Sequence, residues 1–177
     1  MRVFTKCLLV LCVAAGVVPT VGVAVAATRG GAPVVKTPGK VSFVKNQYVK
    51  DTVRFAPGVI TVESGGTVVF KKTDKDPEPH TVTISTKADL PTGFEERCKP
   101  CEIASGHLKN PKNEESGIKT YVLDKGQPGF DVEGDSVVLA PKGPHKTASV
   151  VISAPAGSTL YFVCAIHPWM QGEIRVT

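Results

Sequence analysis

CAIHPWM, residues 164–170, places a thiol, an imidazole and a thioether within one short stretch near the C-terminus. The run before it, TLYFV at 159–163, is rich in β-branched and aromatic residues and predicts a strand that ends at Cys164. Successive side chains of a strand alternate between its faces, so Leu160, Phe162 and Cys164 should share one face. The stretch therefore predicts a core strand that leads into a loop of metal-binding side chains.

The ligand types in this loop indicate copper. A trigonal copper centre takes one thiolate and two imidazoles, with a weak axial thioether. Cys164, His167 and Met170 supply three of these four groups, so one imidazole must come from elsewhere. The candidate is His80, because the alternating residues 80–84 predict a strand that begins at this histidine. A single buried cysteine or methionine would indicate only core packing, and the combination makes the prediction specific.

With these motifs the sequence resembles the cupredoxins, the small blue copper proteins, and within them the amicyanin- and plastocyanin-like kind with a short ligand loop. The resemblance implies one type 1 copper ion with His80, Cys164 and His167 as equatorial ligands and Met170 as the axial ligand. It implies an electron carrier rather than an enzyme. Its transient redox partner would be a cytochrome, an oxidase or a dehydrogenase.

The resemblance also implies roles for residues around the ligands. In this family an asparagine often follows the first histidine and is hydrogen-bonded to the cysteine loop, whereas this chain has Thr81. Electrons usually leave through the loop histidine, here His167, whose ring edge reaches the surface among apolar residues. We expect Ile166, Pro168 and Trp169 to form that docking patch, although Trp169 could instead pack beneath the loop.

The remaining hydrophobic pattern predicts an all-β fold, an antiparallel sandwich with a long insertion loop, and the resemblance to cupredoxins implies that it is a Greek-key β-sandwich. Short apolar or alternating runs separated by turn residues are typical of such sandwiches. The expected strands are residues 59–63, 67–70, 80–84, 136–139, 148–152, 159–163 and 173–176, with 41–44 and 53–55 forming an interrupted edge strand. No amphipathic helix longer than a few turns is expected.

The insertion is predicted at about residues 86–130. It has scattered proline and glycine, many charges and no sustained period. An unstructured segment of this length is uncommon in a compact domain unless it is functional or pinned. It also explains why His80 and Cys164 stand 84 residues apart.

The N-terminus predicts export. Residues 1–6 are a short basic start, and residues 7–27 carry no charge, which is typical of a signal peptide. The small residues 24–26 offer a cleavage site, although the same apolar run could remain as an N-terminal anchor. We therefore expect a signal peptide or anchor at 1–27, a linker at 28–40 and the cupredoxin domain at 41–177, in the periplasm or on the outer face of the cytoplasmic membrane.

Export gives the cysteine count a meaning, because structural disulfides persist outside the reducing cytosol. Two of the five cysteines, Cys7 and Cys12, lie in the predicted signal. Cys98 and Cys101 are close enough in sequence to form a disulfide, which leaves Cys164 for the metal. A second metal site or a regulatory thiol pair are the alternatives for Cys98 and Cys101.

Other classes of function have less support. The net charge of +5 comes from scattered lysines and arginines, so nucleic-acid binding is not indicated. The four histidines are too few for a multicopper oxidase, and His107 and His145 are expected at the surface.

Two alternative functions would also use a copper site. One is a copper carrier or storage protein. The other is a small copper enzyme, which Met170 disfavours because it fills the axial position. We expect a monomer that meets a membrane only if the N-terminal segment is uncleaved.

Overall fold

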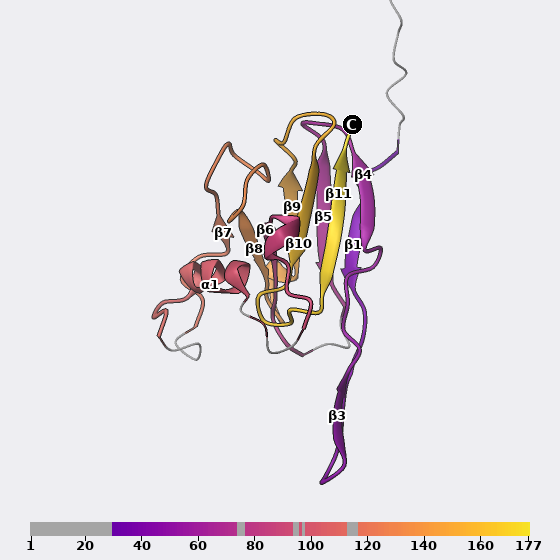
Figure 1. The fold of residues 1–177 in the computed structure, drawn as a ribbon, viewed down its shortest axis with the longest axis vertical. Coiled ribbons are helices and arrows are strands. Elements are labelled where there is room, and N and C mark those ends of the chain that lie inside the picture. Colours follow the sequence, from indigo (N-terminus) through magenta and orange to yellow (C-terminus); the bar gives the residue numbers. More distant parts are fainter. Residues whose placement is uncertain (1–29, 74–76, 94–95, 97, 113–116) are drawn as a thin grey trace, which may run out of the picture.

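The computed structural model describes residues 30–73, 77–93, 96, 98–112 and 117–177. The predicted signal at 1–27, with Cys7 and Cys12, lies outside these residues. The described chain is built almost entirely of strands, arranged in sheets of six, three and two strands (Figure 1). Within this part of the chain, no helix has the length and apolar character needed to cross a membrane.

The largest sheet contains the strands that carry the predicted ligands. Its order is β4-β11-β10-β6-β8-β7, and all its pairs are antiparallel except β4 with β11. The strands are β4 (Val59–Val62), β6 (His80–Ser85), β7 (Val122–Leu123), β8 (Ser136–Leu139), β10 (Thr159–Val163) and β11 (Gln171–Val176). The expected strands at 136–139 and 159–163 are thus confirmed to the residue.

The second sheet packs across the core from the first. It has the order β1-β5-β9, from β1 (Val34–Thr37), β5 (Thr67–Lys72) and β9 (Thr147–Val151). Phe70 of β5 meets Phe162 of β10 edge to face, with ring centroids 5.6 Å apart, and Phe55 meets the same ring at 5.0 Å. Buried side chains from both sheets form one hydrophobic core. The predicted β-sandwich is therefore confirmed.

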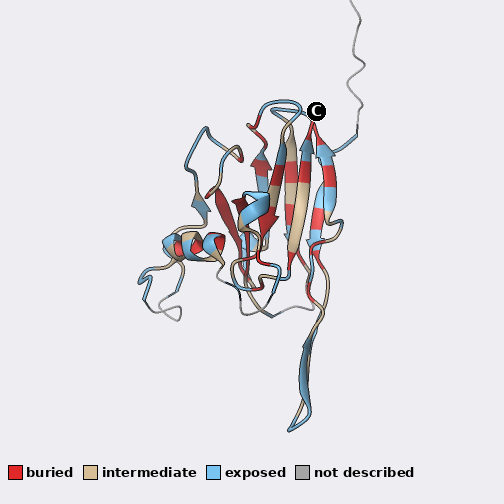
Figure 2. Ribbon diagram, viewed as in Figure 1, coloured by how far each residue is buried: buried red, intermediate tan, exposed pale blue. Residues whose placement is uncertain are grey.

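Two N-terminal segments differ from the sequence prediction. Residues 34–37, expected as part of a linker, form β1 and pair in parallel with β5, because Val35 and Thr37 alternate into the core. Residues 41–44, expected as an edge strand, instead form β2 (Val41–Val44), which pairs with β3 (Tyr48–Asp51) in a separate hairpin. This hairpin projects from one end of the sandwich and is mostly exposed (Figures 1 and 2).

The insertion covers the outer face of β6 and β8 in the large sheet. It contains helix α1 (Lys99–Ala104), short 3-10 turns at Lys87–Asp89 and Ser105–His107, and strand β7, so it is more ordered than a loop. Helix α1 packs against β6. Every residue of β6 and β8 is consequently buried (Figure 2), with one face against the core and the other beneath the insertion.

One glycine permits the close packing of the strand that follows the metal loop. Gly172 of β11 is directly opposite Phe162 in the strand register. A Cβ atom at Gly172 would overlap the Phe162 ring, with the Cε2 atom 2.6 Å away and Cζ closer still. The ring is fully buried between two other phenylalanines, so it has no free space to move into.

We predict that Gly172→Ala lowers the free energy of unfolding by about 1–3 kcal/mol, the usual cost of overpacking a core. Urea unfolding of the metal-free protein measures this change. The matched control is Gly58→Ala, where the nearest atoms would be 3.9 Å from the new Cβ. Equal stability of the two variants would contradict the overlap with Phe162.

Candidate metal centre

Strand pairing brings the distant ligands together. β10 runs antiparallel to β6, with Val163 opposite Thr83. Cys164 follows directly after β10, and His80 is the first residue of β6, so both lie at the same end of the sheet. Because the two strands are neighbours in the sheet, these side chains lie close together although they are 84 positions apart in the sequence.

Three predicted ligand atoms form a small triangle. The Nδ1 atoms of His80 and His167 are 3.2 Å apart, and the Cys164 Sγ atom lies 3.8 Å from the first and 3.6 Å from the second. All three residues are buried. A point equidistant from the three atoms would be about 2.1 Å from each, which is close to the length of a metal–imidazole bond. The trio therefore has both the donor types and the spacing for a trigonal metal ion.

Met170 closes the loop that carries two of these ligands. Its carbonyl accepts a hydrogen bond from the Cys164 N–H at 2.9 Å, and its own N–H donates to the His167 carbonyl at 2.8 Å. Its side chain is fully buried in the core that also contains Cys164. The loop is thus a tight, internally bonded turn, and the role of the Met170 sulfur as a fourth ligand stays a prediction.

Hydrogen bonds at the site favour a thiolate beside an imidazolium. Burial alone would raise the pKa of Cys164, but hydrogen bonds from His167 and His80 lower this pKa to about 6. Burial would lower the pKa of His167, but the Cys164 thiolate and then Glu78 raise this pKa to about 9. The cysteine is therefore ready to bind a cation at neutral pH, and metal binding must displace a proton from His167.

Two carboxylates lie at the outer edge of His167. The His167 Nε2 atom donates to Glu78 Oε2 at 2.6 Å, and an Asp51 carboxylate oxygen from the β2–β3 hairpin lies 3.9 Å from the same nitrogen. Carboxylates of this kind fix the tautomer and orientation of a ligand histidine. The expected exposure of the His167 ring edge is wrong: the residue is only 5% exposed. Glu78 lies two residues before the predicted ligand His80. Nothing in the sequence indicated that Asp51 would lie beside His167.

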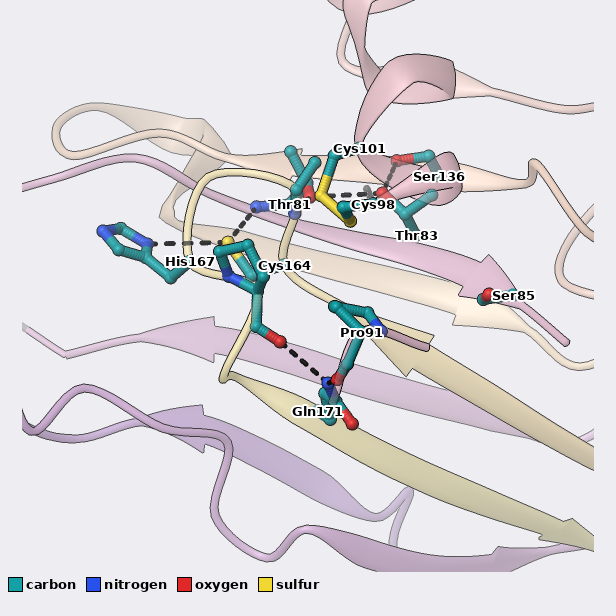
Figure 3. Close-up of a disulfide and its surroundings, with 12 residues drawn as sticks. Thr81, Thr83, Ser85, Pro91, Cys98, Cys101, Ser136, Cys164, His167 and Gln171 are labelled. Atoms are coloured by element: carbon teal, nitrogen blue, oxygen red, sulfur yellow. Dashed lines mark hydrogen bonds between the residues drawn. A yellow bond between two sulfur atoms is a disulfide. The ribbon is translucent and has the colours of Figure 1, made fainter. Parts of the chain in front are cut away.

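Thr81 links the first ligand strand to the cysteine loop. Its N–H donates to the Cys164 Sγ atom at 3.4 Å, and its Oγ1 atom accepts from the Ala165 N–H at 2.7 Å. Figure 3 shows Thr81 between Cys164 and the Cys98–Cys101 disulfide. Thr81 therefore makes the cross-loop bond that the resemblance implied for an asparagine.

The structure also places the remaining cysteines and histidines of the described residues. Cys98 and Cys101 are bonded, which confirms the first of the alternatives for this pair. Cys164 is the free cysteine of the described residues.

His145 is exposed, as expected, and stacks on Tyr121. His107, however, was expected at the surface and is only 2% exposed, because the insertion folds it against β8.

Comparison with known proteins gives structural neighbours only. No family model and no curated protein matches the chain. The solved structures that match the chain include cupredoxins. Their sequence identities and TM-scores are low, so no conclusion about the site rests on this likeness.

Three of these structures illustrate the likeness. A purple cupredoxin from Nitrosopumilus maritimus is 14% identical, with 82% of this chain and 99% of that chain covered and a TM-score of 0.42. Auracyanin A, a blue copper protein from Chloroflexus aurantiacus, is 15% identical, with 82% and 98% covered and a TM-score of 0.44. A mutant fern plastocyanin is 20% identical, with 72% and 91% covered and a TM-score of 0.38.

We predict that the metal-free protein forms the Cys164 thiolate as the pH rises through about 6. The lowered pKa means that this thiolate stabilises the fold at high pH and that its contribution is lost as the pH falls through about 6. The raised pKa of His167 gives the opposite sign, a contribution lost as the pH rises through about 9. The ion pair should therefore be complete only between these two values.

Ultraviolet absorbance of the thiolate, measured as the difference between the native protein and Cys164→Ser, follows this ionisation. Subtracting the variant removes any contribution from other thiols. Ionisation in the range of an ordinary cysteine, at about pH 8.5, would contradict the pairing with the two histidines.

Proposed function

We propose that the chain is an exported type 1 copper protein that carries single electrons between redox partners. The observation that supports this proposal is the buried triangle of one thiolate sulfur and two imidazole nitrogens, from His80, Cys164 and His167. A thiolate with two imidazoles is the donor set of blue copper electron-transfer sites, with a weak axial group such as the Met170 thioether. The structural likeness to cupredoxins concerns the fold alone.

The fold would serve this function by keeping the side chains that bind copper in fixed positions. Copper, when bound, supplies the change between Cu(I) and Cu(II) that accepts and releases one electron. His80 and Cys164 are attached to paired core strands, and Glu78 fixes the orientation of the His167 ring. The site is buried, so bulk water is kept away from the ligand atoms. Little rearrangement should then accompany each electron transfer.

Electrons would pass to a partner over the surface beside the ligand loop. Ile166 and Trp169 are 47% and 44% exposed, and the Trp169 ring meets His167 edge to face at 5.2 Å. A shallow pocket here is lined by Val41, Val49, Asp51, Glu78, His167 and Trp169. The hairpin thus adds apolar side chains to the docking patch expected from the sequence. The partner would be a cytochrome, an oxidase or a dehydrogenase.

Export is supported by the sequence of residues 1–27 and by the Cys98–Cys101 disulfide, because such bonds persist in oxidising compartments. The domain would act in the periplasm or at the outer face of the cytoplasmic membrane. The Cys164 thiol would be protected there from oxidation by its burial and its metal.

We predict that Cu(II) added to the protein produces an intense visible thiolate-to-copper band and a matching electron paramagnetic resonance signal. Cys164→Ser should abolish the band, because it removes the thiolate. Met170→Gln should keep the band but shift it, because the axial ligand tunes the centre. His145→Ala, at an exposed histidine outside the triangle, is the control and should leave the spectrum unchanged.

A colourless, weakly bound Cu(II) that is insensitive to Cys164→Ser would overturn the proposal. A copper carrier or storage protein would then become the better account of the site. A band that is unchanged by Met170→Gln would remove Met170 from the ligand set and leave the other three.

A second prediction concerns the docking surface. Trp169→Glu should slow electron self-exchange between oxidised and reduced protein by about tenfold, because like carboxylates on two approaching molecules repel each other by about 1–4 kcal/mol at contact distance. Line broadening in nuclear magnetic resonance spectra of mixed oxidation states measures this rate. Val151→Glu is the control, since Val151 is equally exposed and ends β9 away from the ligand loop. Equal rates in the two variants would exclude Trp169 from docking, provided that the visible band is intact.

A further inference from the structure

The β2–β3 hairpin is anchored to the sandwich at its base. A two-stranded hairpin is only marginally stable alone in water, so its base must hold it. There the Thr52 N–H donates to the Lys40 carbonyl and the Arg54 N–H donates to the Pro38 carbonyl, both at 3.1 Å. Val53, between the two donors, is buried in the core. From this base the hairpin projects past the end of the sandwich where the β10–β11 loop lies (Figure 1).

One face of the hairpin is apolar and continues the surface beside the ligand loop. In the strand register, Val41 is opposite Asp51 and Phe43 is opposite Val49. Opposite residues of paired strands share a face, and so do alternate residues of one strand, so these four side chains lie on the same face. All but Phe43 line the shallow pocket beside the ligand loop. Phe43 extends this face outward and is 70% exposed, and Val49 is 67% exposed. Exposed apolar surface of this kind marks a site of interaction with another molecule.

The charges that the hairpin presents to solvent are positive. Residues 40–51 contain three lysines, Lys40, Lys45 and Lys50, and all three are exposed. Asp51 is the acidic residue of this segment. Its carboxylate lies 3.9 Å from His167 Nε2, and its side chain is only 15% exposed. The hairpin therefore combines an apolar face with a basic surround.

We propose that the β2–β3 hairpin is a docking arm for a redox protein whose surface has acidic residues around an apolar patch. This inference rests on the proposed function, because the partner would meet the copper ligand His167 across the same surface. The lysines would attract the acidic partner during approach, since opposite charges on two proteins raise the association rate. Phe43 and Val49 would then be buried in the contact, and buried aromatic side chains contribute much of the binding energy at such interfaces.

Two other occupants fit the hairpin less well. A segment that enters a lipid bilayer needs apolar side chains at its leading end, because polar groups are costly to remove from water. The tip of the hairpin is instead Lys45, Asn46 and Gln47, all exposed. A second copy of the chain would bring two sets of lysines together, and like charges repel. An acidic protein with an apolar patch complements both features of the arm.

The first test measures binding by the full-length metal-free protein. The probe is the soluble domain of cytochrome b5, a small acidic haem protein. In a nuclear magnetic resonance titration, the amide resonances of residues 40–51 and of the ligand loop should shift together. Phe43→Ser should weaken binding by about tenfold, because it removes an aromatic contact at the interface. The control is Val122→Ser, which should bind as the wild type does, because Val122 is 57% exposed on β7 at the far edge of the large sheet.

The second test follows reduction of the copper-loaded protein by reduced cytochrome b5 in a stopped-flow instrument. The rate should fall as salt is added, because salt screens the attraction. Lys45→Glu combined with Lys50→Glu should lower the rate at low salt by about tenfold or more. The control pair is Lys109→Glu with Lys125→Glu, which changes the net charge equally at exposed lysines of the insertion and should have a much smaller effect. Reduction by cytochrome c, a basic haem protein, should instead be faster in the hairpin variant.

Unchanged hairpin amides on addition of cytochrome b5, or equal rate losses in the two lysine pairs, would overturn the proposal. Hairpin-dependent binding to anionic phospholipid vesicles, or a hairpin-dependent dimer in sedimentation, would overturn it by assigning the arm to another occupant. A wild-type protein without a thiolate-to-copper band would instead refute the proposed function. The amide titration needs no metal, so it still decides whether the hairpin binds an acidic protein.

Discussion

Burying a thiolate beside two imidazoles is the constraint on which the rest of the structure depends. Charged and polar groups are costly to remove from water unless they are paired, and here His80, Cys164 and His167 pair with one another. His80 begins one strand and Cys164 directly follows another, and these two strands are distant in sequence but adjacent in the sheet. The core phenylalanines hold these strands, and the bonded turn that ends at Met170 holds the third ligand.

The insertion extends the same constraint to the outer face of the sheet. β6 alternates apolar residues, which face the core, with Thr81, Thr83 and Ser85, which face outward. Without the insertion, the outer face of β6 would be exposed and these hydroxyls would be solvated. Beneath the insertion they are buried, and Ser136 of β8 lies within hydrogen-bond distance of both Thr83 and His107. The insertion is therefore a second layer around the site rather than a loop beside it.

The sequence predicted what depends on local pattern and ligand chemistry. Short apolar runs located β8 and β10 to the residue, and soft ligands in one loop pointed to His80 across 84 residues. Prediction from the sequence failed where contacts between distant segments decide whether a residue is in a strand or is buried. Residues 34–37 form a strand only because β5 offers an edge to pair with, and His107 is buried only because the insertion folds over β8. The partnership of Glu78 with His167 also has no local signature.

The most direct test of this account is X-ray absorption at the copper edge of the copper-loaded full-length protein. The account predicts one short copper–sulfur bond, which is lost in Cys164→Ser, together with two imidazole nitrogens. Coordination by nitrogen and oxygen alone in the native protein would contradict it, because the triangle of His80, Cys164 and His167 would then not be the metal centre.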